Sequence, residues 1–201
     1  MIVTIGRQLG SGGSVIGKCL AETMDLAYYD KEILEITARE SGLSQKLFEK
    51  ADERTQKGIP TGFLGMRFPF AGEGGPSLGL SNEMLFRIQS DVIRSLADRR
   101  PSIFIGRCAD YILRERTDLM SVFISADADD RIRRIAEKNN ISPDKARDMM
   151  ESIDKKRAAF YNYYTNKTWG MASSYDFCFN SSRLDIDKII SVLKDIISKR
   201  F

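Results

Sequence analysis

Short hydrophobic runs alternate with helical segments along most of the chain. Residues 2–5, 26–29, 102–105, 119–124 and 175–179 are largely apolar and have the length of buried β-strands. Apolar residues spaced three or four apart predict helices over residues 15–24, 31–41, 44–54, 82–99 and 186–197. This alternation is typical of a mostly parallel sheet flanked by crossover helices. We therefore expect an α/β fold, and the length of 201 residues fits a single domain.

Residues 58–80 do not follow this pattern. They hold seven of the fifteen glycines and three of the five prolines, with Phe63, Phe68 and Phe70 among them. A loop longer than about 12–15 residues in a compact domain is usually functional or disordered. The phenylalanines indicate that this one folds over a ligand or a partner subunit. Together with the helix at 82–99, it could form the contact of a homodimer.

The composition excludes several classes of enzyme. The chain has no histidine, so catalytic triads, His-ligated zinc sites and imidazole acid–base steps are ruled out. Its three cysteines are far apart and form no CxxC pair, which is typical of a reduced chain. No apolar run approaches the ~20 residues of a membrane span, and the N-terminus lacks a basic n-region. We expect a cytoplasmic protein without a membrane partner.

Positive charge is concentrated late in the chain. The net charge is +3, but residues 131–167 carry ten basic and five acidic side chains. A local basic surface suits phosphate-bearing ligands, nucleic acid or anionic lipid, although solvated helix faces are the alternative. Because the net charge is low and no nucleic-acid-binding module is visible, we do not expect a nucleic-acid partner.

A glycine-rich turn joins the first expected strand to the first expected helix. In this position backbone N–H groups can surround an anion, and the helix dipole favours negative charge. The turn therefore predicts a phosphate-binding loop, although a tight strand–helix connection is the alternative. The residues expected to bind the nucleotide phosphates are Arg7, Gly10, Ser11, Gly12, Gly13 and Ser14.

The turn matches the P-loop pattern Gly-x-x-x-x-Gly-Lys-[Ser/Thr] only in part. With Gly12 and Ser14 aligned to its second glycine and its hydroxyl, the lysine position holds Gly13 and the first glycine position holds Arg7. Ser14 stays where a hydroxyl ligand of Mg²⁺ belongs. Either Arg7 or Lys18, one turn into the helix, could supply the missing charge, and the sequence leaves this choice open.

Five segments resemble the cytidylate kinase-like proteins, within the P-loop nucleoside monophosphate kinases. They are Ile-Gly-Arg-Gln-Leu-Gly-Ser-Gly-Gly at 5–13, Ala-Tyr-Tyr-Asp-Lys-Glu at 27–32, Gly-Arg-Cys-Ala-Asp at 106–110, Asp-Lys-Lys-Arg at 154–157 and Tyr-Asn-Tyr-Tyr at 161–164. The resemblance implies the P-loop NTPase three-layer fold with a five-stranded parallel sheet. It also implies an acceptor-binding insert at about 55–99, a basic helical lid at about 131–170, and the use of ATP and Mg²⁺.

The resemblance also implies roles for single residues. Arg107 would contact the phosphate of the acceptor, and Asp30 would lie near the acceptor. Lid arginines would hold the donor's phosphates, with Lys18 adding charge; the arginines are Arg131, Arg134 and Arg157. Local alternatives remain, because Asp30 could cap the following helix, Arg107 could form a surface ion pair, and the arginines near 131–134 could pair with acids three or four residues away on one helix.

One acidic position of the family is also missing. In typical cytidylate kinases the third strand ends in Asp-Gly-Arg, whereas this chain has Ile105-Gly106-Arg107. An acid beside Mg²⁺ is thereby lost, and Asp110 could replace it, so Ser14 and Asp110 are the expected metal ligands. Phosphoryl transfer depends mainly on positioning and charge and needs no histidine.

Two hypotheses follow. The first is ATP/Mg²⁺-dependent phosphoryl transfer to a small acceptor, a nucleoside monophosphate such as CMP or dCMP. The second is a nucleotide-binding regulatory protein that catalyses weakly, because the P-loop lysine and the acid after the third strand are both absent.

Overall fold

The computed structural model describes residues 1–30, 33 and 82–201. The helices expected near 31–41 and 44–54 and the loop 58–80 lie outside these residues. The chain divides into two compact units, the first made of Met1–Asp30 with Ala97–Phe201 and the second of Lys31–Leu96. The second unit contains most of the expected insert, and the first contains every predicted site residue.

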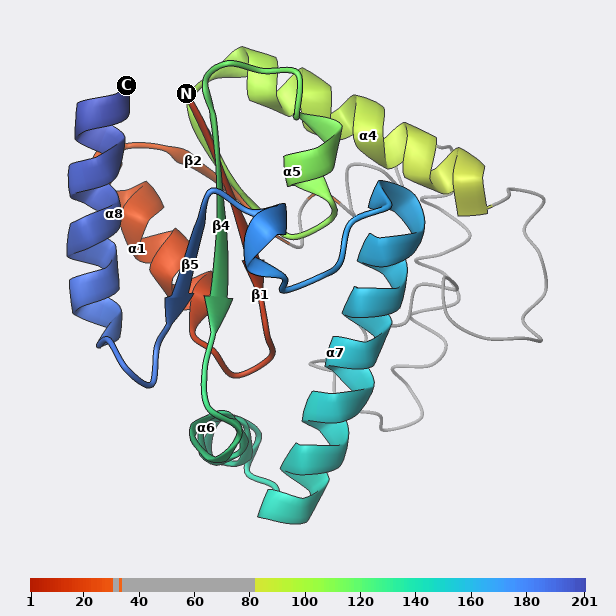
Figure 1. Ribbon diagram of the computed structural model, residues 1–201, viewed down its shortest axis with the longest axis vertical. Helices are drawn as coiled ribbons and strands as arrows, with labels where there is room; N and C mark the ends of the chain where they lie inside the picture. The colour runs from red at the N-terminus through yellow and green to blue at the C-terminus, as the bar shows by residue number, and fades with distance from the viewer. Residues whose placement is uncertain (31–32, 34–81) are drawn as a thin grey trace, which may run out of the picture. The chain divides into compact units, whose positions relative to one another are not determined.

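A five-stranded parallel sheet forms the centre of the first unit (Figure 1). Its strands are β1 (Ile2–Arg7), β2 (Ala27–Tyr29), β3 (Ser102–Ile105), β4 (Leu119–Ser125) and β5 (Phe177–Asn180). The order across the sheet is β2-β3-β1-β4-β5, so β1 is central. In the register, Ile5 pairs with Ile105 on one side and with Val122 on the other. The expected α/β fold with a five-stranded parallel sheet is confirmed.

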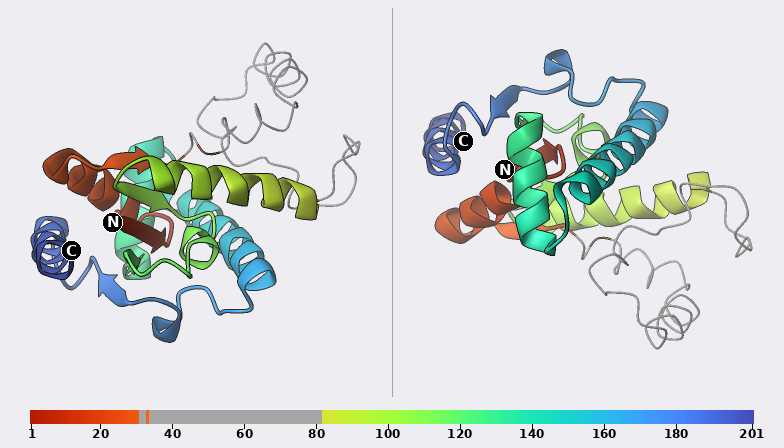
Figure 2. Two further views of the ribbon diagram at one scale, coloured as in Figure 1. Left: turned by 90° about the horizontal axis from the view of Figure 1, so that it is seen from above. Right: turned by 90° about the horizontal axis from the view of Figure 1, so that it is seen from below.

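Two helices cover one face of this sheet. α1 (Gly13–Met24) and α8 (Ile186–Arg200) lie side by side, as the two views of Figure 2 show. Their apolar residues, spaced three or four apart, pack on the sheet in one buried cluster. The cluster includes Val3, Ile5, Ile16, Leu20, Ile189, Leu193 and Ile197. The spacing of these residues is the reason that both segments form helices with one buried face.

The fifth strand begins two residues later than its sequence pattern predicts. Tyr175 ends the short 3₁₀ helix η2 (Ala172–Ser174) instead of starting β5. Its ring packs against Phe123 on β4, with the ring centroids 4.9 Å apart. Tertiary packing of this aromatic side chain therefore overrides its local preference for a strand.

A helical hairpin occupies the region expected to be the lid. It consists of α6 (Ala128–Asn139) and α7 (Pro143–Thr165), which share a small core of Ile132, Ile135, Ala146 and Met150. Ser142 caps α7 by accepting a hydrogen bond from the Lys145 N–H, and Pro143 follows it in the first helical turn. α7 then returns toward the sheet and brings Asp154 and Arg157 to the turn after β1.

Two further helices complete the description. α5 (Ala109–Ile112) follows β3 and contacts β1 and β4. α4 spans Asn82–Arg99, as its sequence pattern predicts, and lies mostly in the second unit. Among the helices that the structure describes, none combines the length and the apolar character needed to cross a membrane.

Candidate active site

The glycine-rich turn between β1 and α1 has a backbone that only glycine adopts readily. Gly10 and Gly12 have φ angles of +79° and +83°, in the left-handed region. A Cβ atom on Gly10 would lie 2.8 Å from the backbone oxygen of Arg131, so α6 packs directly on the turn. Both the dihedral angles and this close approach explain the glycines of the sequence pattern.

The start of α1 presents several hydrogen-bond donors. Gly12 occupies the N-cap position and provides no side-chain cap. Within the described residues, the N–H groups of Gly13, Ser14 and Val15 have no acceptor. A helix begins with unsatisfied N–H groups and the positive end of its dipole. The turn therefore has the features of an anion-binding site.

Arg131 and Asp154 hold the backbone of Leu9 from both sides. The Arg131 Nε donates to the Leu9 carbonyl oxygen at 2.7 Å, and the Leu9 N–H donates to Asp154 Oδ1 at 2.9 Å. Arg131 and Asp154 also form an ion pair through Nη2 and Oδ2, with 7% and 14% of their side chains exposed. Both backbone polar groups of Leu9 are thus satisfied by the α6–α7 hairpin.

Arg134 and Ser181 hold the next part of the turn. Arg134 Nη1 donates to the Gly10 carbonyl oxygen at 3.2 Å and to Ser181 Oγ at 3.0 Å. The Ser181 hydroxyl in turn donates to the Ser11 carbonyl oxygen at 2.7 Å. This arrangement differs from the expectation that Arg131 and Arg134 contact the donor's phosphates. Within the ranges that the structure describes, the carbonyl groups of Leu9 and Gly10 accept no hydrogen bond from a strand or helix backbone. The guanidinium groups of Arg131 and Arg134 donate to them instead.

Asp30 connects Arg7 with Ser14. Its Oδ1 lies 3.4 Å from Arg7 Nη2, and its Oδ2 accepts a hydrogen bond from Ser14 Oγ at 3.4 Å. The Tyr28 hydroxyl lies 3.4 Å from the same Oδ2 and 3.3 Å from the Ser14 carbonyl oxygen. Burial, together with the negative charge of Asp30, raises the pKa of Tyr28 to about 12. Tyr28 is therefore a neutral donor at physiological pH.

Three arginines gather beside the glycine-rich turn. Arg157 Nη1 donates to the Arg7 carbonyl oxygen at 3.0 Å, while Arg107 follows β3, the neighbour of β1. Burial and repulsion from Arg7 lower the pKa of Arg107 to about 10 and that of Arg157 to about 9. Burial also lowers the pKa of Arg7, which Asp30 partly offsets. Arg107 and Arg157 remain cations at neutral pH, and a bound anion would favour the charged form of this arginine cluster (Arg7, Arg107 and Arg157).

The backbone at Arg107 is strained. Gly106, Arg107 and Cys108 have consecutive positive φ angles of 69°, 61° and 55°. Residues other than glycine seldom adopt this conformation, and each instance costs on the order of 1 kcal/mol or more. Such strain persists where the surrounding structure imposes it, and it is common at functional sites. The fold therefore holds Arg107 in this position at the expense of backbone conformational free energy.

Lys18 and Asp110 lie apart from this arrangement. The Lys18 side chain is 69% exposed, and its Nζ is 3.9 Å from Glu22 Oε1 on the same helix. Asp110 is buried and accepts a hydrogen bond from the Tyr161 hydroxyl at 2.7 Å. The structure therefore pairs Ser14 with Asp30, where the sequence pattern led us to expect Asp110. Ile105 stands at the end of β3, where typical cytidylate kinases have an acid. Asp30, which follows the neighbouring strand β2, provides a carboxylate beside Ser14 instead.

Sequence reasoning missed Asp154, Ser181 and Tyr28 as parts of the site. Asp154 belongs to the Asp-Lys-Lys-Arg segment, which offered a signal, but its partner Leu9 lies 145 residues away. Ser181 lies in a polar stretch after β5 with no distinguishing pattern. Tyr28 lies on the short strand β2, two residues before Asp30, so their shared direction could have been inferred from the period of two.

The residues at the turn fit a nucleotide phosphate chain and a magnesium ion. The left-handed glycines, the unpaired N–H groups and the arginine cluster suit phosphate oxygens. The Ser14 hydroxyl and the Asp30 carboxylate supply two oxygen ligands, as Mg²⁺ sites completed by phosphates and water require. In the described part of the chain, no group of three or more acidic or cysteine side chains could hold a metal. Ser14 and Asp30 are the residues that would hold Mg²⁺.

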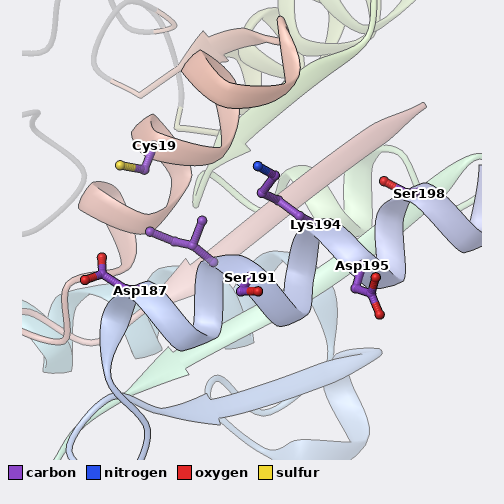
Figure 3. A pocket seen from close by; sticks show the side chains of 7 residues that line it. Cys19, Asp187, Ser191, Lys194, Asp195 and Ser198 are labelled. Atoms are coloured by element: carbon purple, nitrogen blue, oxygen red, sulfur yellow. The ribbon is translucent and has the colours of Figure 1, made fainter.

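A separate groove of about 570 Å³ runs between α1 and α8 (Figure 3). Its lining consists of Cys19, Asp187, Ile190, Ser191, Lys194, Asp195 and Ser198. None of these residues belongs to the glycine-rich turn or to the arginine cluster. The groove is therefore not the candidate active site.

A family model agrees with this geometry. The model of the cytidylate kinase-like family matches residues 2–183, which is most of the chain. This chain belongs to the cytidylate kinase-like family. The match includes the turn, Asp30, Arg107 and the α6–α7 hairpin. P-loop kinases, the broader group with this fold, generally use ATP and Mg²⁺.

Solved structures share the fold. An uncharacterized protein from Eubacterium ventriosum is 25% identical, with a TM-score of 0.74 and 98% of each chain covered. A shikimate kinase from Bacteroides thetaiotaomicron is 15% identical, with a TM-score of 0.54 and 98% of each chain covered. The latter likeness shows the fold alone. No curated protein sequence matches this chain significantly.

Proposed function

We propose that this protein transfers a phosphoryl group from Mg²⁺-bound ATP to a small acceptor that itself carries a phosphate, a nucleoside monophosphate such as CMP or dCMP. The observation that carries the proposal is the arginine cluster beside the phosphate-binding turn. The turn offers a place for the phosphates of the donor, and the guanidinium groups of the cluster offer several donors each to phosphate oxygens.

Each residue has a role that its position supports. The N–H groups at the start of α1 would bind the donor's phosphates, and Ser14 with Asp30 would hold Mg²⁺. Arg107, strained at the end of β3, would orient the acceptor's phosphate, and Arg157 would neutralise charge between the two substrates. Charge stabilisation and in-line positioning are the main requirements of phosphoryl transfer.

One observation favours the alternative of a nucleotide-binding regulatory protein. Arg131 and Arg134, expected on the donor's phosphates, are occupied by backbone carbonyl groups of the turn. Fewer cations are then left for the transition state, and the loss of one preorganised charge commonly lowers kcat on the order of 10²–10³-fold. This alternative predicts nucleotide binding without turnover that depends on an acceptor.

The test is the release of ADP from Mg-ATP across a panel of acceptors. The panel contains CMP, dCMP, UMP, AMP and GMP, together with shikimate and simple sugars that lack a phosphate. We expect turnover with a pyrimidine monophosphate and none with the acceptors that lack a phosphate. Turnover with shikimate or a sugar would contradict the phosphate-bearing acceptor, and ATP binding without any turnover would favour the regulatory alternative.

A matched pair of variants separates the site from nonspecific charge effects. Arg107→Met removes a cation of the cluster, whereas Arg133→Met removes one from the exposed face of α6, where Arg133 pairs with Asp130. We expect Arg107→Met to raise KM for the acceptor and lower kcat on the order of 10²-fold. Arg133→Met should match the wild-type protein.

A further inference from the structure

The backbone of Gly13 lies against the side chain of Arg7. A Cβ atom built on Gly13 would lie 2.6 Å from the Cβ of Arg7 and 3.1 Å from its Cγ. Contacts below about 3 Å between carbon atoms that are not bonded are repulsive, since the optimal separation is about 3.5–4.0 Å. A lysine at position 13 and an arginine at position 7 therefore exclude each other in this backbone.

The Arg7 side chain is held beside the same turn. Its Nη2 lies 3.4 Å from Asp30, which also bonds to Ser14, and its Nη1 rests on Gly106, where a Cβ atom would lie only 2.1 Å away. Its Nε is buried and has no hydrogen-bond partner among the described residues. A buried donor without a partner is rare and costs free energy unless a ligand satisfies it.

We infer that Arg7 and Gly13 have exchanged the two roles of the P-loop pattern, so that the guanidinium of Arg7 supplies the cation that a lysine after the second glycine supplies elsewhere. The inference rests on the proposed function, because it assigns the cation for the phosphates of the same nucleotide. In the P-loop pattern, glycine stands at the position of Arg7 and lysine at the position of Gly13. Here the large cationic side chain and the glycine are reversed.

Lys18 does not compete for this role. Its ammonium group is exposed and faces Glu22 on the outer side of α1. Arg7, in contrast, is linked to Ser14 through Asp30, so its charge lies beside the hydroxyl that would hold Mg²⁺. A guanidinium also offers several donors in a fixed plane, which suits the oxygens of a phosphate chain.

The reciprocal exchange can be reversed by mutation. Arg7→Gly combined with Gly13→Lys gives residues 7–14 the full pattern Gly-x-x-x-x-Gly-Lys-Ser. The other variants are Arg7→Gly, Gly13→Lys and Arg7→Met, the last of which keeps an aliphatic side chain over Gly13 but removes the charge. Binding of Mg-ATP is measured by calorimetry, and the melting temperature without nucleotide shows whether each variant is folded.

We expect Arg7→Met and Arg7→Gly to bind Mg-ATP about tenfold to a hundredfold more weakly than the wild-type protein, as the loss of charge-assisted hydrogen bonds implies. Gly13→Lys alone should lower the melting temperature, because its Cβ meets Arg7. The double variant should melt higher than Gly13→Lys and bind Mg-ATP at least tenfold more tightly than Arg7→Gly.

Two results would overturn the inference while leaving the proposed function in place. One is an unchanged affinity of Arg7→Met for Mg-ATP. The other is a folded double variant that binds no better than Arg7→Gly. Failure of the wild-type protein to bind Mg-ATP would be a different outcome, since it would remove the proposed function and the inference together.

Discussion

The backbone N–H of Leu9 donates a hydrogen bond to the carboxylate of Asp154 at 2.9 Å, across 145 residues of sequence. Arg131 pairs with the same carboxylate and donates to the carbonyl oxygen of Leu9. The glycine-rich turn is therefore held in shape by the α6–α7 hairpin as well as by its own glycines. Any change in the position of this hairpin would be transmitted directly to the turn.

Asp154→Ala tests this connection. Its removal leaves the Leu9 N–H and the Arg131 guanidinium without their shared acceptor in a largely buried position. We expect a loss of about 2–3 kcal/mol in the free energy of unfolding, measured by urea denaturation. Hydrogen exchange at the Leu9 amide should also become faster.

The control for this variant is Asp148→Ala, an exposed position on the same helix. A change of about 0.5 kcal/mol or less is expected there. Equal losses in the two variants would mean that the Asp154 contact contributes nothing beyond an exposed acidic residue of α7.

Lys18→Met provides a second prediction. Because the Lys18 ammonium pairs with Glu22 in solvent, its removal should leave the affinity for Mg-ATP within about twofold of the wild-type value. Arg157→Met, which removes a cation held at the turn, should weaken binding about tenfold or more. Calorimetric titration with Mg-ATP measures both. A large loss in Lys18→Met would show that this lysine reaches the nucleotide after all.

The sheet and its helices could be predicted from the sequence because they depend on local pattern. Residues 102–105 form a strand with the predicted limits, and 82–99 form a helix with the predicted limits. The glycine turn was recognised for the same reason, since positive φ angles and close packing leave a readable glycine signal. Each of these features depends on a few neighbouring residues.

The partners of the charged residues could not be predicted in this way. The family resemblance implies that Arg131 and Arg134 hold the donor's phosphates, whereas in the structure they donate to the carbonyl groups of Leu9 and Gly10. Asp110 is the expected second ligand of Mg²⁺ beside Ser14, whereas the Ser14 hydroxyl donates to Asp30 in the structure. Such pairings depend on which strand ends are adjacent and on how α7 returns, so they require the tertiary structure.

The arginine cluster leads to a third prediction, that pyrophosphate stabilises the folded protein. Arg107 and Arg157 have pKa values lowered by burial and by repulsion from Arg7, so a bound anion relieves an unfavourable accumulation of charge. We expect the melting temperature to rise with pyrophosphate concentration, and the rise to be reduced in Arg107→Met. Sodium chloride at equal ionic strength is the control. An equal rise with chloride would indicate screening of charge without a specific anion site.

Asp110 leads to a fourth prediction, which concerns pH. Burial raises the pKa of Asp110 above its ordinary value, and the hydrogen bond from Tyr161 offsets this only in part. Its stabilising contribution is therefore complete below the pKa of the unfolded state and is lost as the pH rises through the higher pKa of the folded state.

Asp110→Asn keeps an oxygen that accepts the Tyr161 hydrogen bond but cannot ionise. The free energy of unfolding of this variant, relative to the wild-type protein, should thus increase from about pH 4 to about pH 8. Urea denaturation across this range measures the difference, with the exposed Asp129→Asn as control. A difference for Asp110→Asn that stays constant with pH would show that Asp110 ionises as readily in the folded protein as in the unfolded chain.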